Sequence, residues 1–225
     1  LWTNRYNGPA NGNDWANALA VDSVGNAYVT GDSYGIGSSS DYATIAYSSA
    51  GIPLWTNRYN GSGNSGEEPT SIATDDCGNV YVTGYSSSSS SGTDYATVAY
   101  SNAGSPLWTN RYNGPGNGLD EATAVAADAK GNVFVTGRSH SGSNLDVATI
   151  KYVVPPIITC QPLSQTNAVG TTTSFTVEAM GSLPLGFQWR RTGTNLVDGG
   201  NLSGVTTTNL LIANVQFADA CGYSV

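Results

Sequence analysis

Strand-like runs of apolar and polar positions, separated by turn residues, follow one another along the first two thirds of the chain. In one stretch they cover residues 106–112, 122–127, 132–137 and 146–152. Each run is rich in β-branched, aromatic and small side chains and is bounded by Gly, Asn, Asp or Ser. This pattern predicts short antiparallel β-strands, and we expect an all-β protein with almost no helix.

A turn of constant sequence joins the first two runs of each set. It has the motif Asp-x-x-Gly-Asn and begins at Asp22, Asp75 and Asp128. An Asp side chain caps such a turn by accepting hydrogen bonds, and the Gly supplies the positive φ that precedes the next strand. Calcium binding is the alternative, but the motif lacks the alternating oxygen donors of a calcium loop. We therefore assign the three aspartates to turn capping and expect no cofactor.

The runs recur as a repeat of fixed length. The segment Leu-Trp-Thr-Asn-Arg-Tyr-Asn-Gly occurs at residues 1–8, 54–61 and 107–114, with a spacing of 53 residues both times. Four antiparallel strands in about 50 residues are the unit of a β-propeller blade. The sequence therefore predicts three four-stranded blades. Small residues in the first run place that strand innermost, and the aromatic-rich fourth run is then outermost.

Residues 1–152 resemble the SBBP family of bacterial seven-bladed propeller repeats. The likeness is carried by the motifs D-x-x-G-N-x-Y/F-V-T-G, D-Y-A-T-[IV]-A-Y and P-L-W-T-N-R-Y. The resemblance implies a secreted or surface-associated propeller, often one module of a longer chain. Three repeats are too few for a closed ring, since propellers have at least about four blades. We expect either further blades upstream of this sequence or self-association of copies that completes the propeller.

The repeat ends at Tyr152, and residues 153–156 contain two consecutive prolines. Such a pair favours a stiff, extended connector. The predicted organisation is a propeller unit at residues 1–152, a linker at 153–156 and a second domain at 157–225.

The second domain is predicted to be a partial immunoglobulin-like β-sandwich. Strand-like runs cover residues 157–162, 173–179, 186–191 and 208–213. Trp189 lies where strand C of an immunoglobulin fold places its core Trp, and residues 219–223 resemble the tyrosine corner before strand F. The sequence stops as strand F begins, so we expect a module without strand G.

Charge and hydropathy exclude several classes of partner. Lys and Arg number 8 and Asp and Glu number 16, which gives a net charge of −8. A negative chain repels nucleic-acid phosphates and anionic lipids, and no apolar window is long enough to cross a bilayer. We expect no nucleic acid, no membrane insertion and an extracellular or cell-surface location, although the sequence shows no signal peptide.

The cysteines and the single histidine offer little chemistry. Cys77, Cys160 and Cys221 are an odd number, and we predict no disulfide between Cys160 and Cys221, because the two lie at opposite ends of an immunoglobulin sandwich. His140 is expected in a solvated loop. No protease, hydrolase or phosphate-binding motif is present, so we assign no catalytic residue.

Acidic residues just before the first strand are the best candidates for ligand binding. Glu67 and Glu68 in the second copy match Asp120 and Glu121 in the third, and Trp15 stands beside Asp14 in the first. An acidic ring at one mouth of the propeller would hold a cation or the hydroxyl groups of a sugar. Solvated loop carboxylates are the alternative interpretation.

Three functions remain open at this level. The first is a non-enzymatic extracellular or surface module whose loops bind a carbohydrate or a protein. The second is a propeller lectin or part of a carbohydrate-active enzyme, with the four carboxylates in the pairs that glycoside hydrolysis needs. The third is a structural element of an exported fibre or surface layer.

Overall fold

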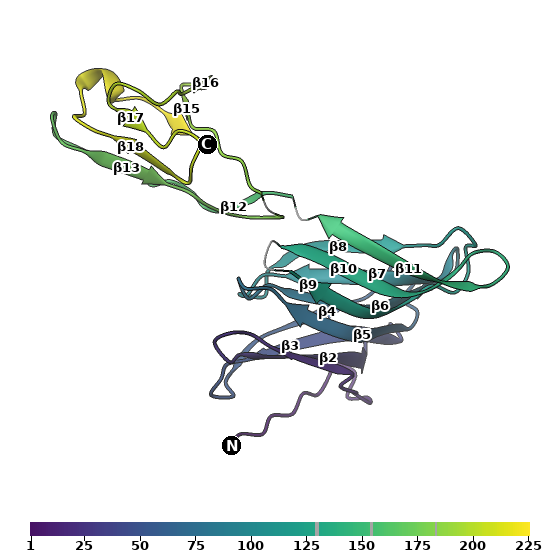
Figure 1. Cartoon of the computed structure of the whole chain (residues 1–225). Coiled ribbons are helices and arrows are strands. Elements are labelled where there is room, and N and C mark those ends of the chain that lie inside the picture. The colour runs from purple at the N-terminus through teal and green to yellow at the C-terminus, as the bar shows by residue number, and fades with distance from the viewer. Residues whose placement is uncertain (129–130, 154, 183) are drawn as a thin grey trace. The chain divides into compact units, whose positions relative to one another are not determined.

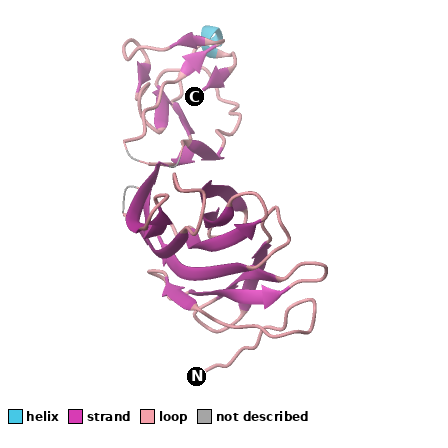
Figure 2. Cartoon of the chain, turned by 90° about the vertical axis from the view of Figure 1, so that its right-hand side faces the viewer, coloured by secondary structure: helices cyan, strands magenta, loops and turns pink. Residues whose placement is uncertain are grey.

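The computed structural model describes residues 1–128, 131–153, 155–182 and 184–225, and within them the protein is all-β (Figures 1 and 2). The one helical element in this described part of the chain is a 3-10 turn in the second unit, η1 (Phe217–Asp219). The chain divides into two compact units, Leu1–Tyr152 and Val153–Val225.

The first unit contains three antiparallel sheets, here called blades 1, 2 and 3, which follow one another in chain order (Figure 1). Blade 1 has strands β1 (Ala18–Val21), β2 (Ala27–Tyr34), β3 (Ser40–Tyr47) and β4 (Pro53–Tyr59). Blade 2 has β5 (Glu67–Thr74), β6 (Val80–Ser88), β7 (Gly92–Tyr100) and β8 (Pro106–Tyr112). Blade 3 has three strands in the described residues, β9 (Glu121–Ala127), β10 (Asn132–His140) and β11 (Leu145–Val153).

Strand order within each sheet follows the chain, so the first and fourth strands form opposite edges. The first strands lie side by side, with β1 against β5 and β5 against β9. Small side chains on these strands permit the close approach. The prediction of three four-stranded units holds for blades 1 and 2, and blade 3 has three strands among the described residues.

The capped turns have the geometry that their sequence indicates. The Asp75 carboxylate accepts hydrogen bonds from the backbone N–H groups of Cys77 and Asn79, at 3.0 and 2.9 Å, and Gly78 has a φ of +78°. Asp22 accepts equivalent bonds in blade 1, and Asp128 accepts a bond of 2.9 Å from the Asn132 N–H in blade 3. Residues 129–130 of the third turn lie outside the described residues.

Aromatic side chains fill the space between neighbouring blades. Trp55 on β4 packs between Tyr28 of its own blade and Tyr100 of blade 2, with ring centroids 5.8 and 5.7 Å apart. Its indole N–H donates to the Asn102 carbonyl at 3.0 Å. Trp108 packs in the same way between Tyr81 and Tyr152 one repeat later, whereas Trp2 is 42% exposed.

The first eight residues are not assigned to a strand, yet they repeat the contacts of β4 one blade earlier. The Trp2 indole N–H donates to the Ser49 carbonyl at 3.3 Å, and the Asn4 amide donates to the Gly51 carbonyl at 2.7 Å. Trp2 also contacts Tyr47, at 5.7 Å between centroids. Segment 1–8 thus occupies, against blade 1, the place that β4 occupies against blade 2.

The second unit has the sheet pattern of an immunoglobulin-like sandwich. One sheet has the order β13 (Thr173–Thr176), β18 (Asn209–Ile212), β17 (Leu202–Ser203), and the other has β16 (Thr194–Asn195), β15 (Arg190–Arg191), β19 (Tyr223–Ser224). A short pair joins β12 (Ile157–Cys160) to β14 (Glu178–Met180).

The core of this sandwich is centred on Trp189, which is fully buried with Val177, Val205, Leu210 and Ile212. The Tyr223 hydroxyl donates to the Asp219 carbonyl at 3.0 Å, which closes a tyrosine corner.

Several predicted boundaries need correction. Strand β11 extends to Val153, the first residue of the predicted linker, and Val154 lies outside the described residues. The strand predicted at 186–191 is paired only at its last two residues, and the one predicted at 173–179 breaks at Val177.

Cys77, Cys160 and Cys221 are free and exposed.

Candidate functional site

A buried polar frame holds one end of blade 1 and one end of blade 2 together. In blade 1 the Arg58 guanidinium on β4 donates to the Ser33 hydroxyl, the Ser33 carbonyl and the Asp41 carboxylate, at 2.5, 2.8 and 2.8 Å. In blade 2, Arg111 makes the same three bonds to Ser86 and Asp94, at 2.6, 3.0 and 2.8 Å. The frame links the second, third and fourth strands, so it fixes the backbone at this end.

One of the predicted ligand-binding carboxylates, Glu67, joins this frame through Ser86, and Asp120 holds the equivalent position one repeat later. Glu67 and Asp120 are fully buried. Asp120 accepts hydrogen bonds from the backbone N–H groups of Gly114 and His140, at 2.8 and 3.0 Å, and Glu67 accepts one from the Ser86 hydroxyl at 3.1 Å. Burial raises the pKa of Glu67. These two side chains are therefore not solvated loop carboxylates, and they cannot contribute to an exposed acidic ring.

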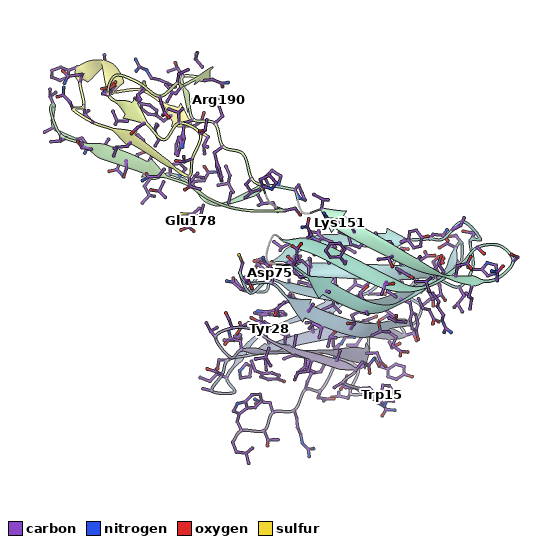
Figure 3. All side chains as sticks on the ribbon, in the orientation of Figure 1. Trp15, Tyr28, Asp75, Lys151, Glu178 and Arg190 are labelled. Carbon is purple, nitrogen blue, oxygen red and sulfur yellow. The ribbon has the colours of Figure 1, made fainter. Side chains whose placement is uncertain are left out.

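The other predicted site residues lie at the same end of the blades but face outward. Trp15 is 49% exposed, Glu68 is exposed and Glu121 is half-buried. Figure 3 shows Trp15 at the end of the blades opposite the turn that contains Asp75. We call this end the variable edge. It contains the predicted site residues Trp15, Glu68 and Glu121. It also contains the residues paired with them on the next strand, Asp32, Tyr85 and Arg138, and the neighbouring Tyr34.

Each blade presents a different pair at the variable edge. In blade 1 the Trp15 N–H donates to the Asp32 carbonyl, and the Trp15 ring contacts Tyr34, at 6.1 Å between centroids. In blade 2 the Tyr85 hydroxyl donates to the Glu68 carboxylate. In blade 3, Arg138 forms an ion pair with Glu121.

Negative charges of the variable edge act on the phenol of Tyr85. The pKa of Tyr85 is raised, first by burial, then by its hydrogen bond to Glu68 and by the negative charges of Glu68, Glu121 and Asp32. These charges come from all three blades. The first strands of the blades, β1, β5 and β9, lie side by side, so Glu68 on β5 and Glu121 on β9 stand on neighbouring strands.

A glycine on the second strand allows the backbone to pack closely at this edge. A Cβ on Gly84 would lie 2.0 Å from the Glu68 carbonyl oxygen, and one on Gly137 would lie 2.1 Å from that of Glu121. Only a residue without a side chain fits there. The Thr-Gly end of the repeat motif thus positions the residues of the variable edge.

His140 is the last residue of β10 and is half-buried, so the predicted loop position was wrong. Its backbone N–H donates to Asp120, and its Nδ1 is buried without a partner among the described residues. Its position in the repeat is that of Tyr34 and Ser87 in the other copies. It flanks the variable edge.

The sequence interpretation missed Asp32, Tyr34, Tyr85 and Arg138. Strand β2 alternates, with Ser33 buried between Asp32 and Tyr34, and the same alternation surrounds Ser86 and Ser139. The sequence did contain a signal for these exposed residues: the amino acids on either side of the serine differ between copies, while the serine itself is constant. Within the described residues, no group of three His, Cys, Asp or Glu side chains is placed to hold a metal ion. In that part of the chain, no helix has the length and apolar character needed to cross a bilayer.

The SBBP beta-propeller repeat family matches residues 2–37 and 54–90. No curated protein matches the chain. Solved structures that resemble it include Drosophila OTK extracellular domains 3-5, at 16% identity and a TM-score of 0.30, covering 82% of this chain and 64% of that one. Another is the titin I-band fragment I67-I69, at 16% identity and a TM-score of 0.32, covering 82% and 67%.

The chain thus spans less than two thirds of the OTK structure. TM-scores of this size define no shared fold, and the immunoglobulin-like assignment rests on the two sheets, Trp189 and the tyrosine corner. The repeat match and the two-unit, all-β architecture fit a binding or scaffold module.

Proposed function

We propose that the first unit is a non-enzymatic module that binds a carbohydrate at the variable edge, outside the cell, with the second unit as a spacer. One observation carries this proposal: the buried frame is repeated between blades, whereas the exposed residues beside it differ. A serine occupies the same position in all three copies, but the residue just before it differs from copy to copy and is Asp32, Tyr85 or Arg138. A constant frame with varied exposed side chains is the arrangement of a scaffold that presents a binding surface.

The chemistry of the variable edge suits a ligand rich in hydroxyl groups. Trp15 and Tyr34 are 49% and 41% exposed and offer apolar faces for a sugar ring. The Asp32 and Glu68 carboxylates accept hydrogen bonds from hydroxyl groups, and Arg138 donates them. The acidic character of the surface favours neutral over anionic glycans.

The same geometry argues against glycoside hydrolysis. Hydrolysis needs two carboxyl groups on either side of the scissile bond. Glu67 and Asp120 are buried in hydrogen bonds, and Glu121 is ion-paired with Arg138. The two remaining carboxylates of the variable edge, Glu68 and Asp32, lie in different blades, and each accepts a hydrogen bond, from Tyr85 and from Asn17 respectively.

A glycan array probed with the full chain tests the proposal. We expect binding to neutral glycans that is lost in Trp15→Ala and weakened in Asp32→Ala. Phe217→Ala, which removes an 88% exposed aromatic side chain from the second unit, is the control and should bind normally.

Absence of glycan binding, or binding that Trp15→Ala leaves unchanged, would contradict the carbohydrate proposal. Release of reducing sugar from a bound glycan would contradict the non-enzymatic assignment.

A further inference from the structure

Blade 3 has the side chains that bind an arginine in blades 1 and 2, but among the described residues no arginine of its own chain is bound there. In blades 1 and 2 the receptor, meaning the side chains that bind the arginine, consists of a serine on the second strand and an aspartate on the third. In blade 1 it also includes a tyrosine from the preceding repeat, because Arg58 donates to the Tyr6 hydroxyl at 3.0 Å. The repeat register places Ser139, Asp146 and Tyr112 at the equivalent positions of blade 3.

The register of blade 3 is maintained despite its one-residue deletion. The hydroxyls of Thr136 and Thr149 lie 2.9 Å apart, as do those of Thr83 and Thr97 in blade 2. Ser139 is 4% exposed, so its place in the frame is preserved. Asp146 is exposed, whereas Asp94 is 3% exposed beneath its arginine.

The edge that would carry the arginine is open in blade 3. Strand β11 lies at the edge of its sheet and pairs only with β10 among the described residues. Open edges expose backbone donors and acceptors that favour the addition of another strand.

The chain contains one unused arginine at the matching repeat position. Arg5 precedes Arg58 by the repeat length of 53, and it is exposed with no hydrogen bond or ion pair in the described structure. Segment 1–8, which carries it, already packs on blade 1 as β4 packs on blade 2. Its backbone pairs with no strand among the described residues.

We propose that segment 1–8 of a second copy of this chain pairs with β11 as its fourth strand, and that Arg5 of that copy binds Ser139 and Asp146. Blade 1 pairs Asn57 with Thr44 and Trp55 with Ala46. The equivalent register places Asn4 opposite Thr149 and Trp2 opposite Lys151.

This association requires no rearrangement, because segment 1–8 stays on its own blade 1 while its free edge meets the other copy. It also joins opposite charges, Arg5 and Asp146.

Sedimentation equilibrium of the full chain tests this inference. We expect reversible association, weakened about 100-fold or more by Arg5→Glu and likewise by Asp146→Arg, because each leaves a charge of the pair unmatched. The double variant Arg5→Glu/Asp146→Arg should associate more tightly than either single variant. Arg190→Glu makes the same charge change in the second unit and should associate like the parent chain.

The peptide of residues 1–8 provides an independent readout. It should dissociate the associated chain, and the same peptide with Arg5→Glu should not. Because Arg5 is exposed and makes no hydrogen bond or ion pair among the described residues, the variants should unfold like the parent under conditions where all are monomeric.

A chain that stays monomeric at all concentrations would overturn the inference, as would association insensitive to Arg5→Glu. Neither result bears on glycan binding by Trp15 and Asp32, so the two proposals fail separately.

Discussion

The phenol of Tyr42 in β3 donates a hydrogen bond of 3.2 Å to the backbone carbonyl of Ala96 in β7, which ties blade 1 to blade 2. The bond recurs one repeat later, where the Tyr95 hydroxyl donates to the Ala148 carbonyl at 3.3 Å. Both tyrosines are fully buried. The joint between blades therefore combines aromatic packing with a directional polar bond, and in the third copy Val147 replaces the donor.

Replacing Tyr42 with Phe should lower the free energy of unfolding of the first unit by about 1 kcal/mol. The Ala96 carbonyl keeps its contact with the Thr83 hydroxyl, so the acceptor is not left alone. Chemical denaturation followed by tryptophan fluorescence measures the change. Tyr34→Phe, at a 41% exposed ring, is the control and should unfold like the parent. Equal effects of the two substitutions would rule out a stabilising role for the Tyr42 hydroxyl.

The buried tyrosines should make the first unit sensitive to alkali. Burial raises the pKa of Tyr42 well above 10.0, and it raises those of Tyr95 and Tyr100 from 10.0 to about 12. A raised pKa means that the folded state holds the proton more tightly than the unfolded state. The corresponding stability is present below pH 10 and is lost as the pH rises from about 10 to about 12.

Denaturation midpoints measured across this interval should fall steadily. The fall should be smaller in Tyr95→Phe, which removes one of the titrating groups. Midpoints that stay constant to pH 12 would contradict the assignment of these tyrosines to the core.

The capped turns should be costly to disrupt. The Asp75 carboxylate accepts four hydrogen bonds, including one of 2.8 Å from the Tyr81 hydroxyl, and Tyr81 is only 2% exposed. Asp75→Ala leaves that hydroxyl and two backbone donors without their acceptor, so we expect a loss of about 2–3 kcal/mol. Asp76→Ala changes an exposed neighbour and should cost about 0.5 kcal/mol or less. Similar unfolding curves for the two variants would count against capping.

Repetition explains why the strands of the first unit could be predicted from sequence. The run predicted at 106–112 matches β8, because each turn signal occurs in equivalent positions of several copies. The second unit has no such repetition, and its predicted strand at 186–191 pairs only at Arg190–Arg191.

The buried frame could not be predicted, because its partners are distant in sequence. Glu67 looked like an exposed loop carboxylate, yet the Ser86 hydroxyl, 19 residues away, binds it in the interior. Arg111 reaches Ser86 across 25 residues. Hydrophobic periodicity carries no information about such polar contacts, so the sequence located the end of the blade that bears the candidate site without separating its buried residues from its exposed ones.

The frame arginines should contribute to stability only where their receptor is present in the same chain. Arg111→Ala removes three hydrogen bonds and leaves the Asp94 carboxylate, 3% exposed, with the Ser91 hydroxyl as its remaining partner. We expect a loss of about 2–3 kcal/mol, below the cost of breaking a fully buried pair because the Arg111 side chain is 27% exposed.

Arg5→Ala is the matched control, since it makes the same substitution at the same repeat position without a receptor in its own chain. It should change the free energy of unfolding by about 0.5 kcal/mol or less at concentrations where the chain is monomeric. Equal losses from the two variants would mean that Arg5 has an intramolecular partner. Equally small effects would mean that the frame organises the strand ends without stabilising them, because the desolvation cost of Asp94 and Arg111 would then offset their attraction.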